Sequence, residues 1–419
     1  MQIVLEQGGH AFRNVGDWAM LEVAIRRLAG LFPDAQLSVF ADDPQRVRER
    51  LAQVHPLTTA GRNMIAGKGC LLGRWADRAA GVESHALHVL PGLTLSAARA
   101  KAQWRRRNIH EADEFVSRLR SADLVVASGG GYLSDAFPGM VYGVCRTLAF
   151  AQARGIPTAL FGQGIGPLTR PPLVRMVGPV LRRAKQITLR ERRRGPAVLR
   201  TLAVDERKVT VTGDDAVELS MDARQEAIGT SIGVNLRMTG YSGVDNQLAQ
   251  AVGATVRKAA AEFDASLTPV PISFYRDGED MRAIERAFGD MDQTTWGGGQ
   301  TGDDLSPQAV IRQVGTCRLV VTASYHAAVF ALAQGIPAIC LVKSEYYAGK
   351  FHGLADMFSD GCRVIDMARP DWRDALGSTI HDAWRSAEAL RPSLIDSARD
   401  QVERGRSAYA QSRCYVEGD

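Results

Sequence analysis

His326 is the residue whose type and position point most clearly to chemistry. It follows the apolar segment Leu319–Ala323, which is typical of a buried strand, and it lies at the start of a helix predicted over about Tyr325–Gln334. A helix N-terminus disfavours the imidazolium form, so we expect a neutral ring that can accept a proton and then donate it. Because parallel sheets bind ligands where their strands end, His326 is the candidate catalytic residue. The alternative is a histidine that is simply satisfied inside the core.

Two arginines also follow predicted strands. Arg190 comes directly after Gln186–Leu189, and Arg237 comes directly after Ser231–Leu236. A guanidinium in such a position can hold a carboxylate or a phosphate with two parallel hydrogen bonds. Residues 170–208 carry 12 basic and 3 acidic residues, and we expect most of these side chains to form a solvated face. Only Arg190 and Arg237 are therefore candidate anion ligands.

Three turns carry residues that could bind a polar ligand. The first predicted strand is followed by a glycine-rich turn from Gly8 to Asp17, where the polar side chains either bind a hydroxylated ligand or cap the next helix. The glycines after Leu124–Ser128 let a ligand approach the backbone, and Gly162–Pro167 adds an amide side chain. Tight turns without a ligand are the alternative in each case. The candidates are Asn14, Asp17, Gly129, Gly130, Gly131 and Gln163.

An internal repeat indicates how these residues are positioned. Phe150–Pro157 and Phe330–Pro337 are identical at six of eight positions, and each lies between two apolar segments. The repeated unit reads as strand, turn, helix, Gly-Ile-Pro and strand, because Gly and Pro end helices. Short apolar strands linked by helices are typical of parallel sheets that are covered on both faces. The sequence thus predicts an α/β fold with two Rossmann-like domains.

The expected domains cover residues 1–225 and 226–375, followed by a helical segment at 376–419 that packs back on them. Residues 55–120 are less regular and predict helices and a loop. Leu319–Val342 has no charged residue and is long enough to span a bilayer. It contains a polar histidine and a Gly-Ile-Pro break, so we interpret it as strand, helix and strand.

Composition narrows the function further. The chain has 419 residues and a net charge of +5, which does not indicate a protein that coats a polyanion. Aromatic residues are not interleaved with the arginines, so nucleic-acid binding is not expected. Six cysteines occur singly, which gives no support to a zinc or redox motif and fits a cytoplasmic protein. The beginning of the chain has no features of a secretory signal. The basic residues Arg192–Arg194 could contact the headgroups of anionic lipids. The sequence does not indicate an oligomeric state.

Several of these segments, taken in order, resemble the polysaccharide pyruvyl transferase family. The resemblance covers about residues 1–360, and the ordered set is more specific than any single motif. The segments are Asn14-Val-Gly-Asp17, Gly129-Gly-Gly131, Gly162-Gln-Gly-Ile-Gly-Pro167, Arg190-Glu191, Gly233-Val-Asn-Leu-Arg237 and His326-Ala-Ala-Val-Phe-Ala-Leu-Ala-Gln-Gly-Ile-Pro337.

The resemblance implies two Rossmann-like domains in a GT-B-like arrangement, with the active site in the cleft between them. It implies that pyruvate from phosphoenolpyruvate is transferred as a ketal onto a sugar of a surface glycan or its lipid-linked precursor. No metal or organic cofactor is implied. His326 would be the catalytic residue. The donor side would use Arg237, Arg190, Lys343, Ser324 and Tyr325, all in the second domain except Arg190. The acceptor side would use Asn14, Asp17, Gly129, Gly130, Gly131 and Gln163.

One position departs from the family pattern. Many members have arginine two residues before the histidine, where this chain has Ser324, and Lys343 is one candidate to replace that charge. Two other functions therefore stay open. One is a GT-B glycosyltransferase that uses a nucleotide sugar, and the other is a non-catalytic relative that binds a sugar or an anion.

Overall fold

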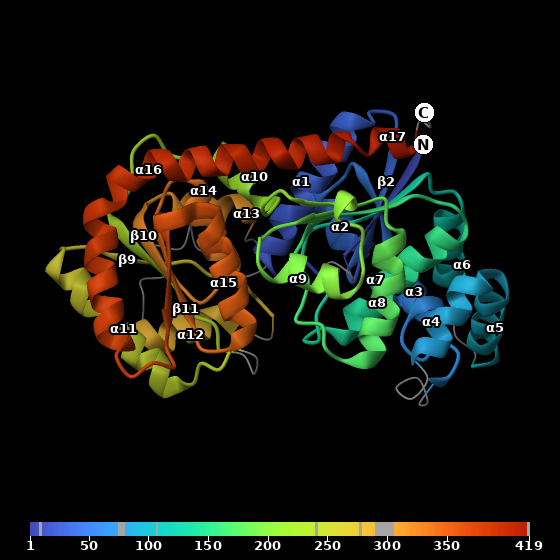
Figure 1. The fold of residues 1–419 in the computed structure, drawn as a ribbon, viewed down its shortest axis with the longest axis horizontal. Helices are drawn as coiled ribbons and strands as arrows, with labels where there is room; N and C mark the ends of the chain where they lie inside the picture. The colour runs from blue at the N-terminus through green and yellow to red at the C-terminus, as the bar shows by residue number, and fades with distance from the viewer. Residues whose placement is uncertain are drawn as a thin grey trace.

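The structure is a computed structural model, and it consists of two parallel β-sheets with helices on both faces (Figure 1). It describes residues 1–7, 11–73, 80–105, 108–238, 242–275, 279–289 and 306–416. The beginning of the predicted glycine-rich turn, Gly8–His10, lies outside these ranges. Across the described ranges, no helix combines the length and the apolar character needed to cross a membrane.

The first sheet has seven strands in the order β3-β2-β1-β4-β5-β6-β7, all parallel. Its first six strands follow the doubly wound dinucleotide-binding order. The strands are β1 (Gln2–Glu6), β2 (Gln36–Ala41), β3 (Val54–Thr58), β4 (Leu124–Ala127), β5 (Thr158–Gln163), β6 (Gln186–Leu189) and β7 (Val209–Val211). The helices between them are α1 (Val15–Leu31), α2 (Pro44–Arg50), α3 (Thr59–Ala66), α4 (Ala80–Val89), α5 (Pro91–Trp104), α6 (His110–Arg120), α7 (Pro138–Ala153), α8 (Pro171–Arg183), α9 (Arg194–Thr201) and α10 (Ala216–Asp222).

The second sheet has the order β12-β11-β10-β8-β9 among the described strands and is also parallel. Its strands are β8 (Ser231–Asn235), β9 (Leu267–Pro269), β10 (Cys317–Thr322), β11 (Ala338–Val342) and β12 (Cys362–Asp366). Its helices are α11 (Asn246–Glu262), α12 (Glu279–Phe288), α13 (Pro307–Val314), α14 (Tyr325–Ala333) and α15 (Glu345–Phe358), followed by α16 (Trp372–Ala410) and α17 (Arg413–Val416).

The two repeated segments form equivalent units, which confirms the interpretation of the repeat. One unit is β4-α7-β5 and the other is β10-α14-β11. Gly155 and Gly335 follow the two helices, and both have φ of 77°, the left-handed conformation that ends a helix. The uncharged segment 319–342 is therefore a buried strand, helix and strand rather than a membrane span.

One strand differs from expectation: residues 55–120 predict helices and a loop, but Val54–Thr58 forms β3, an edge strand that contains Pro56. At one edge of the second sheet, β9 likewise ends in a proline, Pro269. Proline lacks the N–H that a central strand needs, so it is found at sheet edges. Proline therefore weakens the strand signal in the sequence and also restricts the strand to the edge of a sheet.

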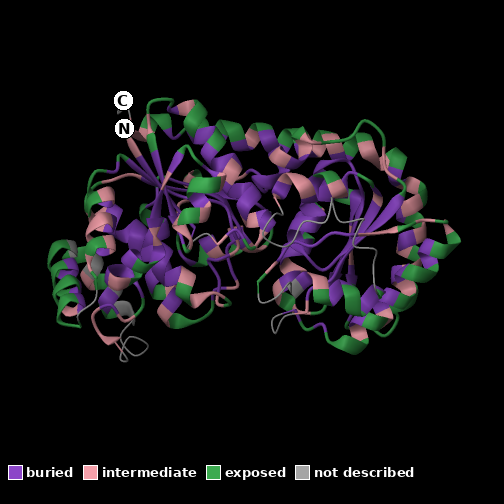
Figure 2. Ribbon diagram, turned by 180° about the vertical axis from the view of Figure 1, so that it is seen from behind, coloured by how far each residue is buried: buried purple, intermediate pink, exposed green. Residues whose placement is uncertain are grey.

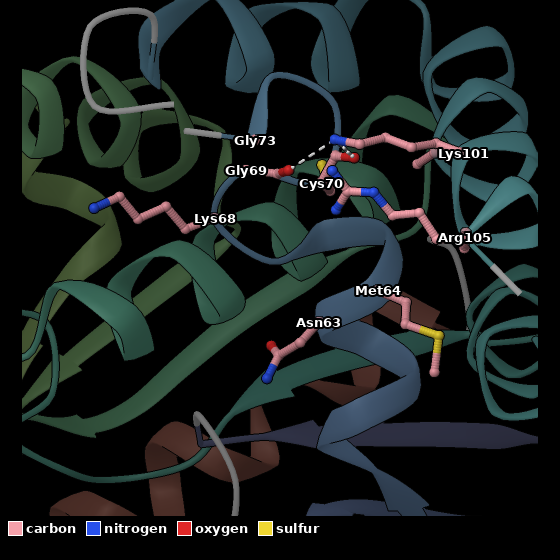
Figure 3. Close-up of a pocket in the computed structure, with 10 residues that line it drawn as sticks. Asn63, Met64, Lys68, Gly69, Cys70, Gly73, Lys101 and Arg105 are labelled. Atoms are coloured by element: carbon pink, nitrogen blue, oxygen red, sulfur yellow. Dashed lines mark hydrogen bonds between the residues drawn. The ribbon is translucent and has the colours of Figure 1, made fainter. Parts of the chain in front are cut away.

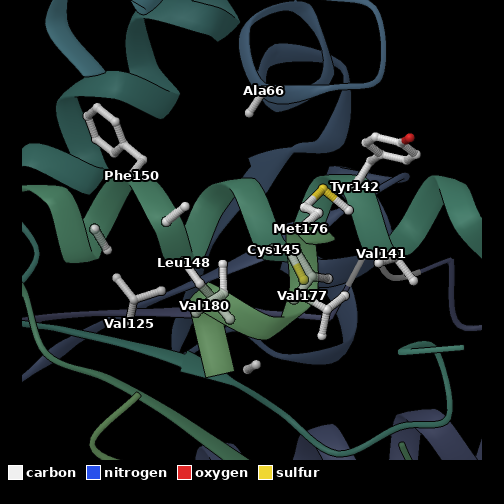
Figure 4. Close-up of a cluster of buried hydrophobic side chains, with 14 of the residues drawn as sticks. Ala66, Val125, Val141, Tyr142, Cys145, Leu148, Phe150, Met176, Val177 and Val180 are labelled. Atoms are coloured by element: carbon white, nitrogen blue, oxygen red, sulfur yellow. The ribbon is translucent and has the colours of Figure 1, made fainter. Parts of the chain in front are cut away.

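Buried residues lie on the strands and on the helix faces turned toward them (Figure 2). Their apolar side chains form the core of each half. In the first half, Cys145 and Leu148 of α7 pack with Met176 and Val180 of α8 above Val125 (Figure 4). The long helix α16 takes part in both halves, as Figure 1 shows along the top of the molecule. Its beginning joins the core of the second sheet, and Tyr409 near its end joins the core of the first.

Candidate active site

The carboxyl ends of the two sheets meet, and they bring together side chains that lie far apart in the sequence. His326, after β10, has its Nε2 atom 3.7 Å from Oδ2 of Asp214, which follows β7. The guanidinium of Arg190, after β6, lies 4.2 Å above the ring of Tyr325. Residues from both halves therefore build one site, as expected for a pair of Rossmann-like domains.

His326 is the second residue of α14, and its side chain is 8% exposed. The first turn of α1 packs directly on the imidazole, because a Cβ atom at Gly16 would overlap the ring. The Nε2 atom is buried and makes no hydrogen bond to any described residue. The ring is thus fixed in place, while its Nε2 atom has no hydrogen bond that would compete with proton transfer.

Asp214 and Arg190 form a buried ion pair beside this histidine. Nη1 of Arg190 donates a hydrogen bond of 3.2 Å to Oδ2 of Asp214, and both side chains are almost fully buried. Burial alone would raise the pKa of Asp214, but His326, Arg190 and the N–H of Ala216 together hold that pKa below its ordinary value. Asp214 is therefore a carboxylate that can orient or stabilise a protonated imidazole.

Lys350 of α15 adds a second buried cation. Its ammonium donates to the hydroxyl of Tyr346 and lies 3.9 Å from the centre of that ring. A Cβ atom at Gly131 would lie 2.9 Å from Nη2 of Arg190 and 3.0 Å from Nζ of Lys350, so both cations border the glycine turn. Burial lowers the pKa of Lys350 well below its ordinary value, and the nearby guanidinium of Arg190 lowers it further. An anion bound here would relieve that repulsion.

Four buried polar atoms at this site make no hydrogen bond to any described residue. They are His326 Nε2, Tyr325 Oη, Ser324 Oγ and Arg190 Nε. Buried polar atoms normally have a partner, and exceptions at one place call for an explanation. Three of the four residues are consecutive at the N-terminus of α14, where the helix also favours negative charge. The arrangement suits a polar, anionic ligand.

The other predicted donor residues are placed differently. Arg237 is bound by both nitrogens of its fork to Asp280, at 2.9 and 3.0 Å, so a protein carboxylate already occupies its bidentate face. Its charge still contributes to the lowered pKa of Lys350. Lys343 is exposed, with Nζ 3.4 Å from the carbonyl of Met367. The structure places Lys350, and not Lys343, beside Arg190.

The predicted acceptor residues shape the opposite wall. Asn14 caps α1, since its Oδ1 accepts hydrogen bonds of 3.1 Å from the backbone of Gly16 and Asp17. The amide nitrogen of Gln163 donates to the carbonyls of Ala127, Ser128 and Phe161 and to the hydroxyl of Tyr132. The Asn14 contacts cap a helix, and the Gln163 contacts hold the turn Gly129–Gly131 in shape. For both residues the described contacts thus match the structural role that is the alternative to ligand binding. The negative charge of Asp17 acts on both Arg190 and Lys350.

A family model named polysaccharide pyruvyl transferase matches residues 14–344, which is most of the chain. The chain belongs to the polysaccharide pyruvyl transferase family. It is therefore a member of a transferase family, and the resemblance read from the ordered motifs is confirmed. A search of curated proteins gave no match.

Solved structures show that this pyruvyl transferase family member has the GT-B fold. The S. aureus MnaA structure with UDP has a TM-score of 0.55 at 11% identity, with 100% of this chain and 97% of that chain covered. A glycosyltransferase from Rickettsia africae has a TM-score of 0.54 at 10% identity, with 100% of this chain and 99% of that chain covered. The UDP-GlcNAc 2-epimerase of Methanocaldococcus jannaschii has a TM-score of 0.51 at 12% identity, with 92% and 93% covered.

Sequence reasoning missed two residues of this family member's site. Asp214 lies three residues after the end of β7 (Val209–Val211), and such a strand-end position is a signal that the sequence offers. Lys350 lies within a helix, and only the packing of α15 against the glycine turn brings it to the site. In the described part of the chain, no group of three or more His, Cys, Asp or Glu residues could hold a metal.

Proposed function

We propose that the protein transfers pyruvate from phosphoenolpyruvate onto two hydroxyls of a sugar, in a surface glycan or its lipid-linked precursor. The observation that carries this proposal is the pair of buried cations, Arg190 and Lys350, beside a buried histidine whose Nε2 makes no hydrogen bond to a described residue. Phosphoenolpyruvate carries a carboxylate and a phosphate on the same carbon, so it needs clustered cations. Membership of the pyruvyl transferase family supports the same reaction.

In the proposed reaction, Arg190 and Lys350 hold the anionic groups of the donor and His326 handles the proton. His326 donates a proton to the terminal enol carbon while one sugar hydroxyl adds to the adjacent carbon and releases its own proton. The second hydroxyl then replaces the phosphate and forms the ketal. The two hydroxyl protons balance the equation: one ends on the new methyl group, and one leaves with phosphate. Asp214 would stabilise the imidazolium between these steps.

The donor would lie on the second domain, residues 226–375, where Arg190 reaches it from the first domain, and the acceptor would lie on the first domain, residues 1–225. The glycine turn Gly129–Gly131 borders both cations, so a sugar hydroxyl there would lie close to the reacting carbon. Ser324 leaves the helix N-terminus without the arginine of many family members, and Lys350 would supply the missing charge. The N-terminus of α14 would add backbone N–H groups for an anion.

The test is to incubate the full chain with phosphoenolpyruvate and extracted lipid-linked or polymeric glycans, and to follow phosphate release. We expect release that depends on both substrates and that falls about 10²- to 10⁴-fold in His326→Gln, because a general acid of this kind contributes that factor. His381→Gln is the matched control, since His381 lies on α16 and pairs with Glu262. No release with any acceptor, together with no thermal shift from phosphoenolpyruvate, contradicts the proposal.

A nucleotide-sugar glycosyltransferase is the second candidate. The observation that favours it is the shared fold with structures solved with UDP, although their identity to this chain is only about a tenth of residues. The same cations and helix N-terminus would suit a diphosphate. A larger thermal shift with UDP than with phosphoenolpyruvate would support this candidate. The third possibility, a non-catalytic binding protein, is tested by His326→Ala: unchanged glycan modification in cells would mean that this histidine does not catalyse the reaction.

A further inference from the structure

Exposed apolar side chains gather on one part of the first half. Seven large hydrophobic residues are exposed in the described part of the chain, and five of them lie between residues 82 and 104. They are Val82, Val89, Leu90, Leu93 and Trp104, with exposed fractions of 63%, 55%, 53%, 69% and 82%. These residues belong to α4, α5 and the residue that joins them, at the end of the molecule opposite the second sheet (Figure 1). Such clustering marks an interaction site.

The exposed residues have helical spacing. On α5, Leu93, Ala97, Ala100 and Trp104 are separated by four, three and four positions, and all four are exposed. The opposite side of α5 is also apolar, with Leu95, Ala98 and Ala102 in the core. The inward side accounts for folding, so the outward stripe needs a different explanation. On α4, Val82 and Val89 are seven positions apart and hence on one face.

Basic side chains border this stripe. A cavity of about 350 Å³ between α3 and α5 is lined by Lys68, Lys101 and Arg105 (Figure 3). The ammonium of Lys101 donates to the carbonyls of Gly69, Cys70 and Leu71 at 2.7 to 3.2 Å, which fixes this charge at the rim. Lys68 and Arg105 are exposed.

Negative charge is scarce in the same region. Residues 68–107 contain eight basic and two acidic residues. One of the two acids, Glu83, is 1% exposed and forms a buried ion pair with Arg146, so it does not reduce the surface charge. The other, Asp77, lies outside the described residues. Among the described residues, the exposed cations Lys68 and Arg105 border the stripe, and the nearby carboxylate of Asp113 on α6 is paired with Arg99 of α5.

We infer that the α4–α5 hairpin docks the protein on an anionic membrane surface. The exposed stripe would enter the boundary between headgroups and acyl chains, with Trp104 in the interfacial position that tryptophan prefers. Lys68 and Arg105 would contact lipid phosphates. The face expected from the sequence, Arg192–Arg194, is less suited, because Arg193 pairs with Asp356 and Arg194 donates to two carbonyls of α15. This inference does not depend on which reaction the protein catalyses.

Sedimentation with vesicles tests the inference, using the full chain and vesicles of phosphatidylcholine with or without phosphatidylglycerol. We expect binding only with phosphatidylglycerol, weakened by salt. Leu93→Ser with Trp104→Ser, and Lys68→Gln with Arg105→Gln, should each weaken it on the order of tenfold or more. Lys258→Gln with Arg385→Gln, two exposed cations of the second half, is the matched control, and Arg192→Gln should also bind like the wild type.

Thermal midpoints and mass in solution complete the test. All of these side chains are exposed, so we expect midpoints within a few degrees of the wild type, which shows that lost binding is not lost folding. Absence of wild-type binding overturns the inference, and so does equal binding by all variants. A change of oligomeric mass in Leu93→Ser with Trp104→Ser, without a change in vesicle binding, also overturns it, because the stripe would then join copies of the chain. None of these readouts requires transferase activity.

Discussion

At the scale of single residues, the site joins one imidazole to two buried cations and one carboxylate. His326 and Asp214 are 3.7 Å apart, too far for a hydrogen bond but close enough for a strong electrostatic interaction once the ring is protonated. Arg190 has Asp214 as a counter-ion. Among the described residues, Lys350 donates a hydrogen bond only to the neutral hydroxyl of Tyr346, and its charge is disfavoured. The lysine is thus the group that an anionic donor would stabilise most.

The lowered pKa of Lys350 predicts a dependence of stability on pH. Its pKa is lowered by burial and by Arg190, so between the folded value and the ordinary 10.5 the unfolded chain binds a proton that the folded chain does not. The free energy of unfolding of the wild type therefore rises with pH through that range. Lys350→Met removes the penalty, so we expect the variant to be more stable than the wild type at neutral pH, by a margin that shrinks toward pH 10.5.

Urea unfolding of both proteins at several pH values measures this margin. Lys258→Met is the control, because Lys258 is exposed on α11, and we expect no more than about 0.5 kcal/mol of change there. A Lys350→Met variant that is less stable than the wild type at neutral pH would show that the ammonium is well compensated in the folded protein.

At the scale of elements, the start of α1 positions the side chain of His326, the proposed catalytic residue. Asn14 caps this helix, and the next turn is fixed to the second half because Val15 N donates to the carbonyl of Ile272 at 3.0 Å. Gly16 then provides the surface on which the imidazole of His326 lies. Only a residue without a side chain fits at that point, which makes the helix start part of the site.

A methyl group at this position should therefore displace His326. In Gly16→Ala we expect phosphate release to fall by about 10²-fold or more, because small misplacements of a catalytic group have effects of that size. Gly30→Ala is the control on the same helix, since a Cβ there meets nothing within 4 Å. It should keep full activity and gain about 0.5–1 kcal/mol of stability, as Ala favours helix over Gly. Full activity in Gly16→Ala would contradict this role.

Most elements could be predicted from the sequence, because the repeated apolar pattern and its Gly-Ile-Pro ends are local signals. The strand-end positions of His326 and Arg190 followed from the same pattern. The pairing of His326 with Asp214 and the arrival of Lys350 depend on how the two sheets meet, and no local signal carries that information. Arg237 shows the converse, since its strand-end position was predicted while its partner Asp280 was not.

At the scale of the whole molecule, α16 ties the two halves together. Trp372 and Leu376 pack into the core of the second sheet. In the core of the first sheet, Tyr409 stacks on Phe161 with 3.9 Å between the centres of the two rings. The hydroxyl of Tyr409 donates to Asp215 at 2.8 Å, beside the ion pair of Asp215 with Arg27. Asp215 directly follows the site residue Asp214, so this helix also supports the site from behind.

Removing one hydroxyl tests that support. In Tyr409→Phe the buried carboxylate of Asp215 loses a donor, and we expect a loss of about 1–3 kcal/mol in the free energy of unfolding, measured with urea. Tyr415→Phe is the control, because the one hydrogen bond of the Tyr415 hydroxyl to a described residue is long, at 3.4 Å, and its loss should stay within about 0.5 kcal/mol. Equal losses in the two variants would show that the network around Asp215 adds nothing specific.

The most direct test of the proposed function is the dissociation constant of phosphoenolpyruvate for the wild type and for Lys350→Met, measured by calorimetry with UDP as a parallel titrant. We expect the wild type to bind phosphoenolpyruvate in preference to UDP. We expect Lys350→Met to bind it at least about tenfold more weakly, because one charge-assisted contact is worth about 1.5–3 kcal/mol. Preference for UDP, or equal affinity of the two proteins for phosphoenolpyruvate, would contradict the proposal.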